Sequence, residues 1–282
     1  MPPAEISTSL QRTYRYLRIG IAGTIVVIFV SVGLAAASVG WLTSVSDYFY
    51  SPARDAFVGA LIAATLALVA LSGHGPERAL LDAAALFAPL IAVVPTTLAP
   101  VTVPGIIVPC TTRCFPPAFE ADAGNGVITY LIVGGLTVTV ALLLVWLRQV
   151  SIVGVGFSLV IACAVFLTVA LTWAFAREAF LQQGHFVATI AFFGLFATVA
   201  ILNAFPRRGA PPAPIFRALY TAIAILLAIV LVVYIVLLPQ TSASDIPIAL
   251  IAEAAALALF IAFWVVQGIE NWNEADPRLR AD

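Results

Sequence analysis

Long apolar runs separated by short polar connectors make up most of this chain. Each run approaches or exceeds the roughly 20 predominantly apolar residues that a helix needs to cross about 30 Å of hydrocarbon. The eight runs cover residues 19–39, 56–71, 79–94, 127–147, 152–176, 186–205, 218–238 and 246–269. This pattern predicts an all-α polytopic transmembrane bundle of eight helices, with residues 1–282 forming a single integral membrane domain.

The longest connector, residues 95–126, is rich in proline and interrupts the apolar pattern most strongly. Proline removes a backbone donor and pushes its neighbours toward extended conformations, so we predict an extended, turn-rich extracytoplasmic loop. The first apolar run is too long for the apolar region of a signal peptide, and no small-residue cleavage site follows it. We therefore expect it to remain as a transmembrane helix.

The arginines are distributed unevenly between the two sides that this topology creates. All thirteen basic residues are arginine, and ten of them fall on the side that holds both termini. Those ten are at positions 12, 15, 18, 78, 148, 207, 208, 217, 278 and 280, and the remaining three are at 54, 113 and 177. Because positively charged loops stay in the cytoplasm, we expect both termini to be cytoplasmic in a multi-pass protein of the cell membrane.

Composition strengthens the membrane assignment and excludes several classes of function. Hydrophobic residues make up 62% of the chain, whereas soluble domains contain about 45–50%. The formal net charge of -1 offers no field for nucleic acid, so we predict no nucleic-acid partner. The absence of lysine excludes a retinal Schiff base and other lysine-dependent covalent chemistry, and we expect no cofactor.

The cysteines and histidines predict a disulfide and no metal centre. Cys110 and Cys114 lie in the long extracytoplasmic connector, where an oxidising compartment favours a bridge over two free thiols. A cysteine pair without a nearby histidine supplies only half of a tetrahedral metal site. His74 and His185 fall on opposite sides of the membrane, so they cannot share a metal ion. Cys163 lies within an apolar run and is interpreted as a small lipid-buried or packing residue.

The connector between the first two runs holds the densest polar patch of the chain. In one interpretation Tyr48 and Tyr50 belong to an interfacial aromatic belt, and Asp55 lies near a helix N-terminus. In the other, Arg54 forms a paired network or an anion-binding point with Asp47 and Asp55. The sequence leaves both interpretations open.

Two polar residues of the later runs are also candidates for a site. Glu253 follows seven residues into the last run, about 10 Å below the outer interface. A carboxylate at that depth costs about 2.5–3.5 kcal/mol unless it finds a partner, which indicates either a functional group or a hydrogen bond between helices. His185 opens the sixth run on the same side, where a headgroup contact or a cap is more common than a catalyst.

Several of these segments resemble one family of membrane proteins. The stretch 44–61, Ser-Val-Ser-Asp-Tyr-Phe-Tyr-Ser-Pro-Ala-Arg-Asp-Ala-Phe-Val-Gly-Ala-Leu, is similar to the first outer loop of uncharacterised bacterial multi-pass proteins. That group is distantly similar to the DRAM/Sfk and GPI-remodelling membrane families. Residues 94–96, the segment that begins at His185, and Glu253 with Trp264 resemble the same group.

The resemblance covers the first three and last three apolar runs, and it implies a six-helix pattern in which residues 97–184 are an insertion. Gln267 stands where the family pattern has a basic residue. The resemblance implies no established reaction. It associates the chain only broadly with lipid handling and membrane organisation.

Three functions are consistent with these observations. We favour binding or handling of a membrane lipid or amphiphile in a polar pocket on the extracytoplasmic side. The residues predicted to line it are Asp47, Tyr48, Tyr50, Arg54, Asp55, His185 and Glu253. The alternatives are a proton-coupled small-solute transporter that uses Glu253, and a structural or assembly subunit with a membrane-protein partner or a second copy of itself. Catalysis, with Glu253 or Asp55 as base and His185 as acid, is unsupported because no nucleophile is indicated by spacing.

Overall fold

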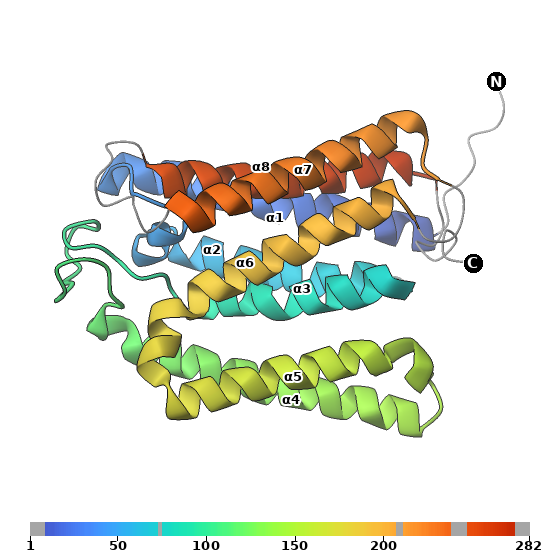
Figure 1. Ribbon diagram of the computed structural model, residues 1–282, viewed down its shortest axis with the longest axis horizontal. Coiled ribbons are helices and arrows are strands. Elements are labelled where there is room, and N and C mark those ends of the chain that lie inside the picture. Colours follow the sequence, from blue (N-terminus) through green and yellow to red (C-terminus); the bar gives the residue numbers. More distant parts are fainter. Residues whose placement is uncertain (1–8, 73–74, 207–210, 238–246, 274–282) are drawn as a thin grey trace.

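The chain folds into a bundle of long helices (Figure 1). The computed structural model describes residues 9–72, 75–206, 211–237 and 247–273. Its α-helices are α1 (Ser9–Val39), α2 (Arg54–Leu71), α3 (Gly75–Val93), α4 (Glu120–Trp146), α5 (Ile152–Phe175), α6 (Arg177–Ala204), α7 (Pro214–Leu237) and α8 (Ile248–Glu270). Two short 3-10 helices, η1 (Ser46–Tyr50) and η2 (Pro117–Phe119), lie in the connectors. These elements confirm the all-α class, and the described ranges contain no β-strand beyond one isolated bridge.

Several helices extend beyond the apolar runs that predicted them. α1 begins at Ser9 and α6 at Arg177, ten and nine residues earlier than their runs, which is about two and a half to three helical turns. α4 begins at Glu120, so residues 120–126 are helical and do not belong to the extended loop predicted for 95–126. Apolar periodicity stops where a helix leaves the hydrocarbon, but the backbone ladder continues. Acidic residues in the first turn of α4 also favour an earlier start, because they lie at the positive end of the helix dipole.

Seven of the helices are long and apolar enough to span a membrane, which indicates a multi-pass membrane protein. They are α1, α2, α4, α5, α6, α7 and α8. α3 differs because Glu77, Arg78 and Asp82 fall within its first two turns. Its status as an eighth transmembrane helix stays a prediction.

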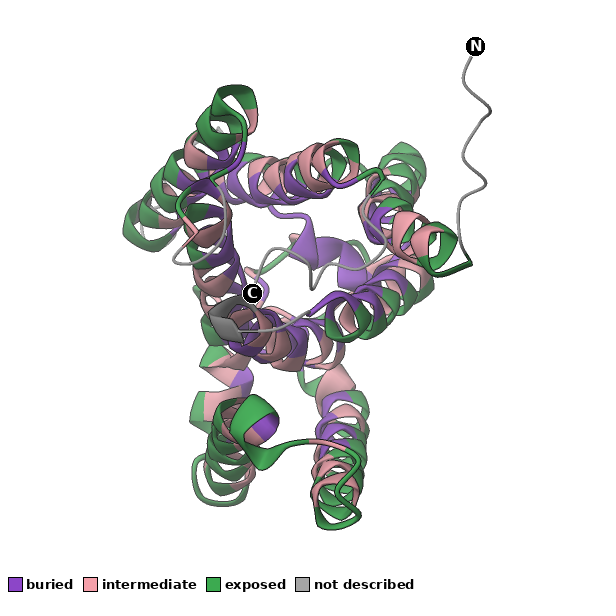
Figure 2. Cartoon of the chain, turned by 90° about the vertical axis from the view of Figure 1, so that its right-hand side faces the viewer, coloured by how far each residue is buried: buried purple, intermediate pink, exposed green. Residues whose placement is uncertain are grey.

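Six helices form a closed ring. α1 packs against α2 and α8, α2 against α3, α3 against α6, α6 against α7, and α7 against α8. The view along the helices shows this ring and its buried inner faces (Figure 2). The ring consists of the three helices before residue 97 and the three that begin after residue 176, although these two halves are distant in sequence.

α4 and α5 form a hairpin outside this ring (Figures 1 and 2). The two helices pack against each other and against α3. Tyr130 of α4 donates a hydrogen bond to the carbonyl oxygen of Leu86 in α3, at 3.1 Å. Within the hairpin, Gly134 lies directly against the ring of Phe166. Cys163 is exposed on this hairpin, which leaves lipid contact as the remaining alternative of the two predicted for it.

The two ends of the ring differ in structure. At one end the start of α1 meets the end of α8, where Arg15 donates to the Trp272 carbonyl at 2.6 Å and Arg18 to the Asn271 carbonyl at 3.2 Å. At the other end lie η1, residues 94–119 and the first turns of α6, and we call this end the mouth. The start of α1 and the end of α8 therefore lie at the same end of the bundle.

Aromatic side chains fill the ring between these two ends. Phe196 of α6 lies 4.6 Å from Phe260 and 4.7 Å from Phe263, measured between ring centroids. Trp264 and Phe192 pack around the same group. These residues are buried, so the ring beyond the mouth is a packed apolar core.

Candidate functional site

The floor of the mouth is formed by the short helix η1, which is buried throughout its length. The Ser44 hydroxyl accepts a hydrogen bond from the backbone N–H of Asp47 at 2.9 Å and so fixes the first turn. The N–H of Leu250 in α8 donates to the Thr43 carbonyl at 2.9 Å. A hydrogen bond between a side chain and the nearby backbone, such as the one between Ser44 and Asp47, favours a short turn over a continued α-helix. As a result, a polar segment is held inside the end of an apolar ring.

Glu253 is anchored to this floor. Its carboxylate accepts a hydrogen bond from the backbone N–H of Ser46 at 2.8 Å and another from the Tyr234 hydroxyl at 3.1 Å. The side chain is buried, and its donors come from η1 and α7 while it belongs to α8. A buried carboxylate is stabilised only by such bonds, so Glu253 joins three elements at one point.

His185 links α6 to the same floor. One ring nitrogen, Nδ1, lies 2.7 Å from the carbonyl oxygen of Val94, and the other, Nε2, lies 2.9 Å from the Ser46 hydroxyl oxygen. Because a carbonyl can only accept, we assign the ring proton to Nδ1. The neutral imidazole then offers the Nε2 lone pair to the hydroxyl of Ser46.

Asp47 and Arg113 form the second charged part of the site. The carboxylate of Asp47 is fully buried, accepts a bond from the Thr43 hydroxyl at 2.5 Å, and lies 3.4 Å from a guanidinium nitrogen of Arg113. Arg113 also donates to the carbonyl of Thr97. Burial raises the pKa of Asp47, and the positive charge of Arg113 opposes part of that rise.

The proline-rich connector positions Arg113. Leu98 and Cys114 exchange two backbone hydrogen bonds of 3.0 Å, and a disulfide joins Cys110 to Cys114 with a Cα–Cα distance of 6.2 Å. Arg113 lies inside this five-residue loop. The disulfide closes the loop that contains Arg113, and the bonds to Leu98 fasten the end of that loop to the start of the connector.

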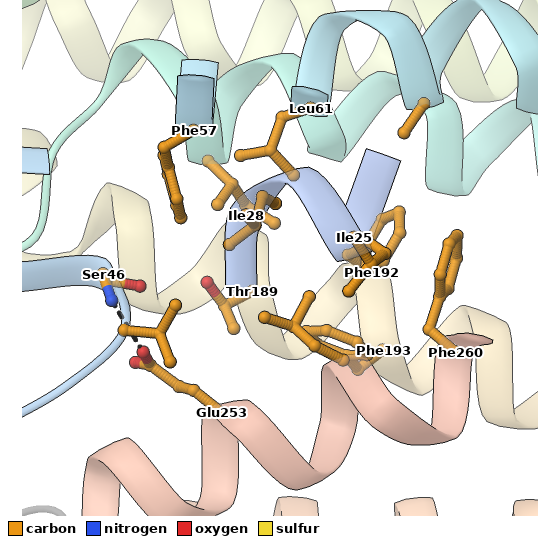
Figure 3. A pocket seen from close by; sticks show the side chains of 14 residues that line it. Ile25, Ile28, Ser46, Phe57, Leu61, Thr189, Phe192, Phe193, Glu253 and Phe260 are labelled. Carbon is orange, nitrogen blue, oxygen red and sulfur yellow. Dashed lines mark hydrogen bonds between the residues drawn. The ribbon is translucent and has the colours of Figure 1, made fainter. Parts of the chain in front are cut away.

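Two cavities meet at Glu253. The larger, about 260 Å³, is the mouth pocket, which is lined by Ser44, Thr96, Thr97, Arg113, Gln182, Gln183, His185, Phe186, Tyr234, Ala249 and Glu253. The smaller, about 40 Å³, lies deeper in the ring, where Ser46, Thr189 and Glu253 are its polar lining residues (Figure 3). A water molecule needs about 10–15 Å³ on this measure, so the inner cavity holds a few waters at most, whereas the mouth pocket accommodates a ligand group of many atoms.

The structure brings together three of the residues predicted for the site. His185 and Glu253 line the mouth pocket. Asp47 does not line it, but Asp47 pairs with Arg113, which does. These residues come from η1, α6 and α8.

The other four predicted residues do not line the pocket. Tyr48 is buried and holds the connector after α1, since its hydroxyl donates to the Gly40 carbonyl at 3.2 Å. Tyr50 donates to the Thr96 carbonyl at 2.6 Å. Both are packed inside the protein, which differs from the arrangement of an interfacial aromatic belt.

Arg54 and Asp55 do not form the network considered with Asp47. Arg54 pairs with Asp122 at 2.8 Å, and its guanidinium carbon lies 4.5 Å from the centroid of the Phe49 ring. Asp55 is exposed in the first turn of α2, without an ion pair in the described part of the chain. The arginine that reaches Asp47 is Arg113, about sixty residues further along the chain.

Three functional candidates were missed by the sequence reasoning. Arg113 was counted only for topology, and Ser46 and Tyr234 were not singled out. Ser46 lies next to Asp47 in the polar connector, so its position was a usable signal. Tyr234 is one of the few polar groups in its apolar run, and a tyrosine at that position could have been paired with Glu253 across a helix hairpin.

The described residues contain no group of three or more histidine, cysteine, aspartate or glutamate side chains that could hold a metal ion. His74 lies outside the described residues.

Comparison with known proteins gives no assignment. No protein-family model matches the chain, and neither a curated protein nor a solved structure is significantly similar to it.

Proposed function

We propose that this multi-pass membrane protein binds a lipid or another amphiphile by its polar group in the mouth pocket. The single observation that carries the proposal is a polar pocket of about 260 Å³ at the end of a ring that is otherwise packed with apolar side chains. Burying polar groups in a membrane protein is costly, so such a cluster marks a functional site by default. The orientation in which the mouth faces away from the cytoplasm belongs to the same proposal and rests on the arginine distribution.

The lining residues favour a ligand that carries an acidic group. The guanidinium of Arg113 borders the pocket, and the described structure shows bonds from only one of its nitrogens, Nη2. Arginine carries five N–H donors, so most of them remain for a ligand. Gln182 and Gln183, in the second turn of α6, also line the pocket. Guanidinium and amide donors together suit a phosphate or carboxylate group.

Native mass spectrometry of the protein released from lipid nanodiscs tests this proposal. We expect the wild type to retain lipid, and we expect Arg113→Ala to lower the retained fraction at least tenfold. A hydrogen bond to a charged group contributes about 1.5–3 kcal/mol, which corresponds to a factor of ten or more. Arg54→Ala is the matched control, because Arg54 lies at the same end but pairs with Asp122 outside the pocket. A wild-type protein without lipid, or equal retention in all variants, would refute the proposal.

A transporter is the second candidate, because Glu253 borders both cavities. A proton carrier needs access to its titrating group from two sides. Below the inner cavity, however, Phe196, Phe260 and Trp264 pack closely together. In this conformation the aromatic core separates Glu253 from the opposite end of the ring, so the geometry supports binding better than transport.

A further inference from the structure

We propose that Ser46 and His185 form a nucleophile and base that cleave a carboxylic ester of the amphiphile held in the mouth pocket. This inference rests on the proposed function, since the pocket must first bind the amphiphile. It goes further, because it assigns a hydrolytic activity and names the reacting atoms.

The geometry of the pair matches what nucleophilic catalysis requires. A serine hydroxyl becomes reactive when a base accepts its proton and a third group orients that base. His185 Nε2 lies 2.9 Å from the Ser46 hydroxyl oxygen, and Nδ1 donates to the Val94 carbonyl, which follows α3 directly. Three segments that are distant in sequence therefore place the hydroxyl, the base and its orienting carbonyl group in one chain of hydrogen bonds.

Backbone hydrogen bonds fix Ser46 in position. Its backbone N–H donates to Glu253, and the neighbouring Thr43 carbonyl accepts from Leu250. The main chain of η1 is thus fastened to α8 at two points, and these bonds place the hydroxyl of Ser46 next to His185. Ser46 borders the inner cavity and not the mouth pocket, and the two cavities adjoin at Glu253, so the ester has to reach the hydroxyl past that side chain (Figure 3).

The depth of the pair indicates the chemical class of substrate. α6 has 28 residues and is about 42 Å long, which exceeds the hydrocarbon thickness by about 12 Å. His185 is eight residues after the start of α6, about 12 Å along the helix. If α6 is centred in the bilayer, His185 lies about 6 Å inside the hydrocarbon boundary. The ester groups of glycerolipids lie close to that boundary, between the polar headgroup and the acyl chain.

The reaction balances with water as the only co-reactant. The Ser46 oxygen attacks the ester carbonyl carbon while its proton passes to His185 Nε2, and the carbonyl oxygen becomes an oxyanion. The ester C–O bond then breaks, and the leaving alcohol takes the proton from Nε2. Water hydrolyses the acyl-serine by the same route and releases a carboxylic acid.

Labelling with a fluorophosphonate tests the proposal, because this probe reacts with activated serines and not with a serine that merely donates a structural hydrogen bond. The protein is labelled in nanodiscs of an ester-linked phospholipid, and the modified residue is identified by peptide mass spectrometry. We expect an adduct on Ser46 that is absent from Ser46→Ala. His185→Gln should label at least about 100-fold more slowly, as expected for loss of a general base. Ser51→Ala is the control, since Ser51 is in the same connector but bonds to the Tyr48 carbonyl.

The outcomes separate catalysis from binding. A wild-type protein that retains lipid but shows neither an adduct on Ser46 nor release of fatty acid overturns the catalytic inference and leaves the proposed binding function intact. Equal labelling rates in the wild type and a folded His185→Gln variant also overturn it. A wild-type protein that retains no lipid contradicts the proposed binding function, on which the catalytic inference rests. Labelling of the wild type is informative even if His185→Gln does not fold.

Discussion

At the scale of single residues, the structure of the mouth depends on which charged side chains pair inside the protein. Asp47 is fully buried, and its carboxylate has Arg113 and the Thr43 hydroxyl as partners. Arg54 lies nearer in sequence but turns outward to Asp122. The arginine nearest in sequence is therefore not the partner of Asp47. Arg54 lies at the start of α2, and Arg113 lies in the distant connector between α3 and α4.

Asp47 makes the stability of the fold depend on pH. Burial raises its pKa in the folded state above the ordinary value of 3.8, so folding favours the protonated carboxyl. Its stabilising contribution is full below pH about 4 and is lost as the pH rises through the raised pKa. We expect the wild type to lose free energy of unfolding relative to Asp47→Asn over that range, by at most about 1.4 kcal/mol per pH unit. Thermal unfolding in detergent at several pH values measures this. Parallel pH profiles for the two proteins would contradict it.

The sequence anticipated part of the site for a physical reason. Charged or polar residues within apolar runs are costly, so Glu253 and His185 were recognisable without a structure. Arg113 was not recognisable as a site residue, because it lies in a proline-rich loop with no periodicity to indicate its direction. Tyr48 and Tyr50 were placed on the right side of the bundle, but their hydroxyls hold backbone carbonyls inside the protein.

At the scale of elements, apolar runs predicted which segments are helical better than where the helices begin. α1 and α6 begin ten and nine residues before the apolar pattern, because backbone hydrogen bonding does not require apolar side chains. The short helix η1 had no periodic signal and is defined by local bonds from Ser44 and Ser51. The separation of the α4 and α5 hairpin from the ring also depends on tertiary packing, which apolar periodicity does not encode.

The α4 and α5 hairpin offers a paired test of helix packing. A Cβ atom at Gly134 would lie 2.2 Å from the Phe166 ring, whereas a Cβ atom at Gly135 would have no neighbour within 4 Å. We expect Gly134→Ala to weaken the hairpin by about 1–3 kcal/mol through overpacking. Gly135→Ala should change little. Hydrogen–deuterium exchange would show faster exchange in α4 and α5 of the first variant, with the ring helices unchanged. Equal exchange in both variants would mean that the contact with Phe166 contributes nothing.

At the scale of the whole molecule, the mouth end of the ring carries several paired charges. The three arginines at the mouth each face a carboxylate, in the pairs Arg54 with Asp122, Arg113 with Asp47, and Arg177 with Glu120. Arginines neutralised in this way add little positive charge to their side of the membrane. The predicted orientation rests on the count of arginines, ten against three, because carboxylates contribute little to it.

Chemical labelling tests the orientation that follows. Ile107 is 84% exposed in the mouth connector, and Gln149 is exposed in the turn between α4 and α5 at the opposite end. In a Cys163→Ser background, we expect a membrane-impermeant maleimide to label Ile107→Cys in intact cells. Gln149→Cys should be labelled only after the membrane is permeabilised. The reverse pattern would place the mouth in the cytoplasm and reject the predicted topology.

The central claim is that the mouth pocket holds the polar group of a membrane amphiphile, and a crystal structure grown from a lipidic mesophase tests it most directly. The account predicts electron density for a phosphate or carboxylate within hydrogen-bonding distance of the Arg113 guanidinium, with the rest of the ligand extending between His185 and Glu253. A mouth pocket that contains only ordered water in the presence of saturating lipid would contradict it.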